Sequence, residues 1–196
     1  MLFRSLAIVL PVSLFIIFMI LYFKFKRVVT TGLIFSGIAV AWAGGFLLIW
    51  LYGQPWFLDI SLLGIHFRDL FQLHTINLSV AIWVGFLALF GIATDDGVLI
   101  ATYLEQSFAR HKPESIEQVR HATMEAGQKR VRPMIMTTAT TLLALLPILT
   151  STGRGSDIMI PMAIPAFGGM LVAIITMFVV PVLYAAIEER KIRKMM

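Results

Sequence analysis

Residues 78–104 read LSVAIWVGFLALFGIATDDGVLIATYL, a long apolar stretch that contains two adjacent acids, Asp95 and Asp96. An apolar helix of about 20 residues can cross the hydrocarbon core of a bilayer. An ionised Asp near the centre of such a helix costs about 2.5–3.5 kcal/mol on insertion scales, so acids in spans usually face a bundle interior and mark ion or proton pathways. The stretch therefore predicts a membrane helix that carries a proton-handling site.

The rest of the chain has the composition of a membrane protein. Hydrophobic residues make up 59% of it and charged residues only 14%, against about 25% charged in soluble domains. We expect an all-α, polytopic membrane bundle of five transmembrane helices plus interfacial helices, which occupies residues 1–196 as one unit. Five stretches are long and apolar enough to span a bilayer: 5–23, 29–52, 78–104, 133–150 and 158–187.

The basic residues predict the orientation of these spans. If five spans alternate, 13 of the 16 Lys and Arg fall on one side of the membrane, and the positive-inside rule makes that side cytoplasmic. We therefore expect a bacterial inner-membrane protein with a periplasmic N-terminus and a cytoplasmic C-terminus. Because the basic residues lie in short clusters between apolar runs, the net charge of +5 indicates membrane topology and no nucleic-acid partner. The 13 residues are Lys24, Lys26, Arg27, Arg110, Lys112, Arg120, Lys129, Arg130, Arg132, Arg190, Lys191, Arg193 and Lys194.

Two connecting segments have patterns of their own. Residues 53–77 mix aromatic and charged side chains, which is typical of a segment along the outer membrane interface. Residues 113–130 begin with Pro113 and Glu114 and end with Lys129 and Arg130, the charge order that a helix dipole favours. We expect a short amphipathic cytoplasmic helix there.

Helix geometry separates the two acids, because residues three and four apart share a face. Asp95 shares its face with small residues such as Ala88 and Gly91, which let other helices approach, and is the better candidate for a central proton site. Asp96 lies on a bulkier face and would be a partner or stay protonated. The alternative is that both are neutral hydrogen-bonding groups of structural importance.

Other polar and sulfur-containing side chains give weaker signals. The hydroxyl of Thr137 could relay a proton, although Thr in membrane helices often bonds its own i−4 carbonyl. Thioethers suit copper(I) and silver(I), but most of the 11 Met are expected to fill gaps. His66 and His74 could bind a divalent ion or simply lie at the interface. With no cysteine, and no nucleophile–base pair or catalytic metal cluster in the pattern, we expect no enzyme and no resident cofactor.

Three stretches together resemble a known family. NLSVAIWVGFLALFGIATDDGVLIATYL, RVRPMIMTTATTLLALLPILTSTGRGSDIMIPMAIPAFGGM and FVVPVLYAAIEER are similar to the last three spans of resistance-nodulation-division (RND) efflux pumps. Their heavy-metal branch, with the copper/silver and cobalt–zinc–cadmium pumps, is the nearest. The resemblance implies a homotrimeric proton antiporter that exports metal cations, with twelve spans per subunit and two periplasmic domains. This chain would supply spans eight to twelve.

The same resemblance implies partners and residue roles. The partners would be the lipid bilayer, the N-terminal half and periplasmic domains, a periplasmic adaptor and an outer-membrane channel. Asp95 falls where metal pumps carry a proton-relay Glu, Thr137 resembles a relay Thr, and Arg130 resembles a basic residue at the cytoplasmic mouth of the proton route. Met159 looks like one Met of the methionine path in copper/silver pumps, whereas Met134 replaces a relay Lys. Two other functions stay open: an RND exporter of organic compounds, and a non-transporting truncated membrane fragment.

Overall fold

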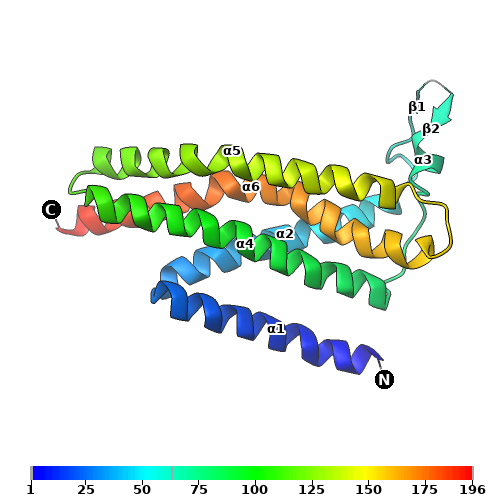
Figure 1. Ribbon diagram of the computed structural model, residues 1–196, viewed down its shortest axis with the longest axis horizontal. Helices are drawn as coiled ribbons and strands as arrows, with labels where there is room; N and C mark the ends of the chain where they lie inside the picture. Colours follow the sequence, from blue (N-terminus) through cyan, green and yellow to red (C-terminus); the bar gives the residue numbers. More distant parts are fainter. Residues whose placement is uncertain (1, 63, 196) are drawn as a thin grey trace.

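The structure is a computed structural model that describes residues 2–62 and 64–195, and it is a bundle of long helices (Figure 1). Five helices are long and apolar enough to cross a membrane, which confirms the predicted all-α, five-span fold class. A two-stranded antiparallel hairpin and a one-turn helix complete the described elements. The elements are α1 (Leu2–Phe25), α2 (Val28–Tyr52), β1 (Ser61–Leu62), β2 (Ile65–His66), α3 (Phe67–Leu70), α4 (Val80–His111), α5 (Ile116–Leu149) and α6 (Ser156–Met195).

Helix α6 is the centre of the bundle, because it packs against α2, α4 and α5. Helix α1 lies at the edge (Figure 1) and exposes large apolar side chains such as Ile8, Phe15 and Phe23. In a membrane these side chains face lipid, which is as apolar as they are, so they need no protein cover. The bundle core is apolar, and its largest fully buried side chains include Phe86, Phe90 and Ile164.

Glycines allow the close crossing of α2 and α6. A Cβ atom at Gly44 of α2 would lie 2.8 Å from the backbone oxygen of Gly168 on α6, and a Cβ at Gly168 would lie 2.7 Å from the oxygen of Gly44. Small residues at helix interfaces let backbones approach and increase dispersion contacts, which drive association in lipid. The Gly44–Gly168 crossing therefore holds α2 on the central helix.

Helix α5 differs from the sequence prediction. The amphipathic helix expected at 113–130 and the span expected at 133–150 form one uninterrupted helix, Ile116–Leu149. Pro133 lies inside it, and a proline removes only one helical hydrogen bond, which membrane helices tolerate. The helix begins at Ile116 because the Ser115 hydroxyl caps it by accepting from the Gln118 N–H at 3.3 Å.

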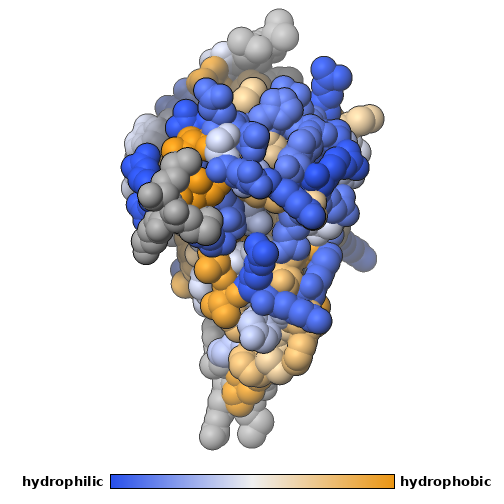
Figure 2. Space-filling model, turned by 90° about the vertical axis from the view of Figure 1, so that its left-hand side faces the viewer, coloured by the Kyte–Doolittle hydropathy of each residue, from blue (hydrophilic) through white to orange (hydrophobic). Residues whose placement is uncertain are grey.

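The two ends of the bundle differ in character. One end, which we call the basic end, holds the α1–α2 connection, the α4–α5 connection and the C-terminal part of α6, and with them most of the basic residues. Figure 2 looks onto this end and shows hydrophilic side chains gathered over it. Ion pairs tie its helices together: Arg120 of α5 contacts Glu189 of α6 at 2.8 Å, and Arg27 contacts Glu188 at 3.8 Å.

The opposite end, which we call the hairpin end, carries residues 53–79 and the α5–α6 connection. Its hairpin and α3 project away from the bundle (Figure 1). The guanidinium of Arg68 donates to the backbone oxygens of Gln54 and Pro55 at 3.0 and 2.7 Å. The Gln72 side chain donates to the Ser151 backbone oxygen at 2.6 Å, which fastens the segment to the α5–α6 connection. In place of a longer interfacial helix at 53–77, the described residues of this segment form a hairpin and the one-turn helix α3.

Candidate functional site

The acid pair lies on α4, and its two members face different surroundings. Asp96 is half-buried and lines a small cavity between α2, α4, α5 and α6, whereas the side chain of Asp95 is exposed on the surface of this chain. Within this chain it is thus Asp96, and not Asp95, that faces the bundle interior. No hydrogen bond or ion pair of either carboxylate occurs within residues 2–62 and 64–195.

The cavity beside Asp96 is small and mostly apolar, with about the room of one water molecule. Apart from Asp96, its polar side chain is that of Thr176 on α6, whose hydroxyl donates to the Ala173 backbone oxygen at 2.7 Å. The lining residues are Ile34, Gly37, Ala93, Asp96, Gly97, Ile100, Met134, Ala173, Thr176, Met177 and Val180. A single water here could connect the Asp96 carboxyl to the Thr176 hydroxyl, which still has lone pairs to accept with.

Met134 lies directly at this cavity and is buried, with 4% of its surface exposed. A thioether is only a weak hydrogen-bond acceptor and carries no charge. The position therefore closes one side of the Asp96 cavity with a neutral group and offers no counter-ion. Any opposite charge that balances an ionised acid pair must come from elsewhere.

Asp95 lies on an exposed face of α4 that carries small side chains. Ala88 and Gly91, which share its helix face, are exposed as well, and a Cβ atom built at Gly91 would meet nothing within 4 Å. The sequence prediction that this face accepts another helix fits the geometry, but no helix in the described part of the chain covers it. Asp95 as the central proton site stays a prediction.

Thr137 is exposed on α5, and its hydroxyl donates to the backbone oxygens of Pro133 and Met134 at 3.2 and 3.0 Å. This local bonding is the alternative to a relay role that is expected for Thr in a membrane helix. The hydroxyl can still accept a hydrogen bond from outside this chain. The structure does not bring Thr137 to the Asp96 cavity, which Met134 lines in its place.

Arg130 lies on the side of the acid pair that faces the basic end. Its guanidinium carbon is 6.0 Å from the centre of the Tyr103 ring, within the range of a cation–π contact. Tyr103 is two turns beyond Asp96 on α4, about 10 Å along the helix axis. The Nε of Arg130 is buried and makes no hydrogen bond with the described residues, so this donor is unused in the present conformation.

Met159 lies near the start of α6 at the hairpin end and is 43% exposed. It is about 25 Å along α6 from Thr176, the residue of that helix beside Asp96. The structure therefore places Met159 far from the acid pair, and a metal-binding role for it stays a prediction.

Sequence reasoning missed two small residues of this site, Gly97 and Gly37. A Cβ atom at Gly97 would lie 2.8 Å from the side chain of Ile34 on α2, so glycine lets α2 pass close to the acid pair. The signal was present in the sequence, since Gly97 directly follows Asp96. Its meaning depends on which helix lies opposite, and that is visible only in the fold.

Comparison with known proteins identifies the family. The chain matches the AcrB/AcrD/AcrF family over residues 70–188, which is more than half of its length. The chain belongs to this family. Its helices α4, α5 and most of α6, with the acid pair, lie in the matched region.

Individual relatives specify the branch of RND proteins. The chain is 34% identical over 205 residues to the cation efflux system protein CusA of Escherichia coli K12, covering 97% of this chain and 17% of CusA. It is also 34% identical over 202 residues to the putative cation efflux system protein SilA of Salmonella typhimurium, with the same shares. Identity to the cobalt-zinc-cadmium resistance protein CzcA of Cupriavidus metallidurans is 30% over 180 residues, or 91% of this chain and 14% of CzcA.

These relatives are heavy-metal RND transporters, as the resemblance in the sequence implied. The chain spans about a sixth of the length of the curated relatives it matches. No solved structure matches it. The family and the five apolar helices together indicate a multi-pass inner-membrane protein.

Proposed function

We propose that this chain is the part of a proton-driven heavy-metal cation exporter that carries protons on the acid pair of α4. The observation that supports it most directly is the exposed Asp95 in the middle of a span, next to the half-buried Asp96. An ionised Asp exposed to hydrocarbon costs about 2.5–3.5 kcal/mol, so the position is tolerable only if another helix covers it or a proton neutralises it. An acid that carries protons inside a transporter meets both conditions, because another helix covers it and it takes up a proton.

The cover for Asp95 would come from the rest of the transporter. The stripe of Ala88, Gly91 and Asp95 permits close approach of another helix, and such a helix could bring the opposite charge that Met134 lacks. In the proposed assembly that helix belongs to the N-terminal half, within a homotrimer that works with a periplasmic adaptor and an outer-membrane channel. The metal cation and protons would be its transported substrates, and proton transfer by the acid pair would need no cofactor.

The direction of transport follows from the proposed orientation. With the basic end in the cytoplasm, protons would enter from the hairpin end, protonate Asp95 and leave past Arg130 towards the basic end. Asp96, with its one-water cavity and Thr176, would take up the proton when Asp95 releases it. Thr137 would accept a hydrogen bond from the covering helix, and Met159 would contact the metal on the periplasmic side.

The test is metal resistance of cells that depend on the intact transporter. Asp95→Asn keeps the size of the side chain and removes its proton chemistry, so resistance should be lost while expression and assembly stay normal. The matched control is Asp59→Asn, an exposed acid of the hairpin end outside the spans, which should keep full resistance. Normal resistance with Asp95→Asn would refute the proton role, and resistance to organic compounds alone would refute the metal substrate.

A further inference from the structure

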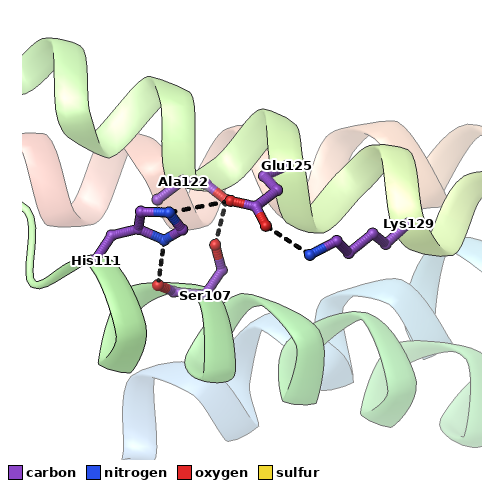
Figure 3. Close-up of polar contacts among 5 residues, drawn as sticks. All are labelled: Ser107, His111, Ala122, Glu125 and Lys129. Atoms are coloured by element: carbon purple, nitrogen blue, oxygen red, sulfur yellow. Dashed lines mark hydrogen bonds and ion pairs between the residues drawn. The ribbon is translucent and has the colours of Figure 1, made fainter.

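A second group of chemically active side chains lies at the basic end, far from the acid pair. His111 in the last turn of α4 meets His121 and Glu125 of α5, and one ligand atom from each of the three lies within 4.8 Å of the others. His121 and Glu125 are four residues apart on one helix and therefore share a face. Figure 3 shows His111 pointing from the end of α4 towards Glu125 on the neighbouring helix.

Hydrogen bonding fixes the state of the His111 ring. Its Nδ1 is 3.0 Å from the backbone oxygen of Ser107, which can only accept, so Nδ1 must carry the hydrogen (Figure 3). The other nitrogen, Nε2, then points its lone pair or a second hydrogen at the Oε2 atom of Glu125, 3.1 Å away. A bond from Nδ1–H to a backbone carbonyl is the arrangement that orients metal-binding histidines.

The Nε2 lone pair of His111 and the Oε2 atom of Glu125 repel each other at 3.1 Å unless a proton or a metal cation lies between them. Because Lys129 donates to the other carboxylate oxygen at 2.5 Å, the pKa of Glu125 is held below its usual value and the group stays ionised. The positive centre is either a second proton on His111 or a metal ion.

The distance between the Nε2 atom of His111 and the Oε2 atom of Glu125 suits a divalent metal ion such as zinc. Zinc binds histidine nitrogen and carboxylate oxygen at about 2.0–2.2 Å, which places neighbouring ligand atoms about 3.3 Å apart in a tetrahedron. The Nε2–Oε2 distance is close to this value. The ligand atom of His121 lies within 4.8 Å of those of His111 and Glu125, and the residue is exposed, so a movement of about 1.5 Å brings it to the spacing of about 3.3 Å.

We propose that His111, His121 and Glu125 form a binding site for a divalent transition-metal ion, with water in the remaining position. Imidazole and carboxylate together suit zinc, cobalt and nickel, whereas copper(I) and silver(I) prefer sulfur. A bound ion would join the ends of α4 and α5, where Ser107 already donates to the Ala122 oxygen at 2.8 Å (Figure 3). The site does not depend on the proposed transport function.

Neighbouring charges limit the affinity. Lys129 shares the Glu125 carboxylate, and Arg110 lines the same pocket as Glu125. Both cations repel a divalent ion, so we expect binding in the micromolar range and not at the picomolar level of structural zinc sites. Lys129→Gln should therefore tighten binding, a change that a purely structural ion-pair network would not produce.

The test is a zinc titration of the full chain in detergent, by calorimetry and by competition with a zinc-binding dye. We expect one Zn²⁺ per chain, and His111→Ala or His121→Ala should each weaken binding about tenfold or more, because even outer-shell changes cost 10–100-fold. His74→Ala is the matched control, since it removes an exposed histidine of the hairpin end and should leave binding unchanged.

Circular dichroism checks that each variant folds, and His121, being exposed, provides a test even if His111→Ala does not fold. Absence of zinc binding in the wild-type chain would overturn the proposal. So would binding that is unaffected by His121→Ala, or that is lost equally in His74→Ala. If the chain binds zinc at this site but Asp95→Asn keeps full metal resistance in the intact transporter, the proposed proton role is refuted and the zinc site is not.

Discussion

Substitution of Gly44 by alanine tests whether the close crossing of α2 and α6 holds the bundle together. The new Cβ would lie 2.6 Å from the Cβ of Val172 and 2.8 Å from the backbone oxygen of Gly168. The backbone oxygen cannot rotate away as a side chain can, so the helices must separate. Overpacking of this kind typically costs about 1–3 kcal/mol.

A matched control isolates that cost. Gly32→Ala lies on the same helix, and a Cβ atom there meets nothing within 4 Å. Both variants gain the same intrinsic helix preference of alanine over glycine, about 1 kcal/mol, so the difference between them reports the clash alone. The free energy of unfolding, measured on the full chain in mixed micelles, should be about 1–3 kcal/mol lower for Gly44→Ala than for Gly32→Ala. Equal stability of the two variants would refute the assigned crossing.

Two further contacts can be tested by single substitutions. Because Arg120 donates to Glu189 at 2.8 Å, the pKa of the Glu189 carboxyl lies below its usual value of 4.5. A lowered folded-state pKa contributes stability above the unfolded value and loses it as the pH falls through the folded value. Thermal melting should therefore show Arg120→Gln below wild type at pH 7, with the gap closing below about pH 4; a gap that persists in acid would contradict the ion pair. Gln72→Ala removes the 2.6 Å bond to the Ser151 oxygen and should increase protease cleavage within 53–77, whereas unchanged cleavage would show that the segment is held by other contacts.

Much of the fold was predictable because lipid imposes simple rules. Backbone groups in hydrocarbon must bond within their own helix, so each long apolar stretch had to be a helix. Helix continuity was harder to predict. The helix expected at 113–130 and the span expected at 133–150 are one helix, because the loss of one hydrogen bond at Pro133 does not end a helix whose neighbours still pack against it.

The face of α4 that points inwards could not be predicted from one chain. Residue size identified Asp95 as the acid on the side where another helix can approach, and the exposed small stripe is consistent with that. The size of the side chains does not show whether the approaching helix belongs to this chain. Within this chain, the acid that faces the bundle interior is Asp96. The group of His111, His121 and Glu125 was missed for a similar reason, because His111 joins the others only when α4 and α5 lie side by side.

The most direct test of proton transfer by the acid pair measures proton flux through the intact transporter. The transporter would be reconstituted in liposomes with a trapped pH-sensitive dye, and flux would be started by adding the metal cation. The account predicts metal-dependent proton flux in the wild type, reduced flux in Asp96→Asn, and flux no higher than that of protein-free liposomes in Asp95→Asn. Wild-type flux in Asp95→Asn would contradict it.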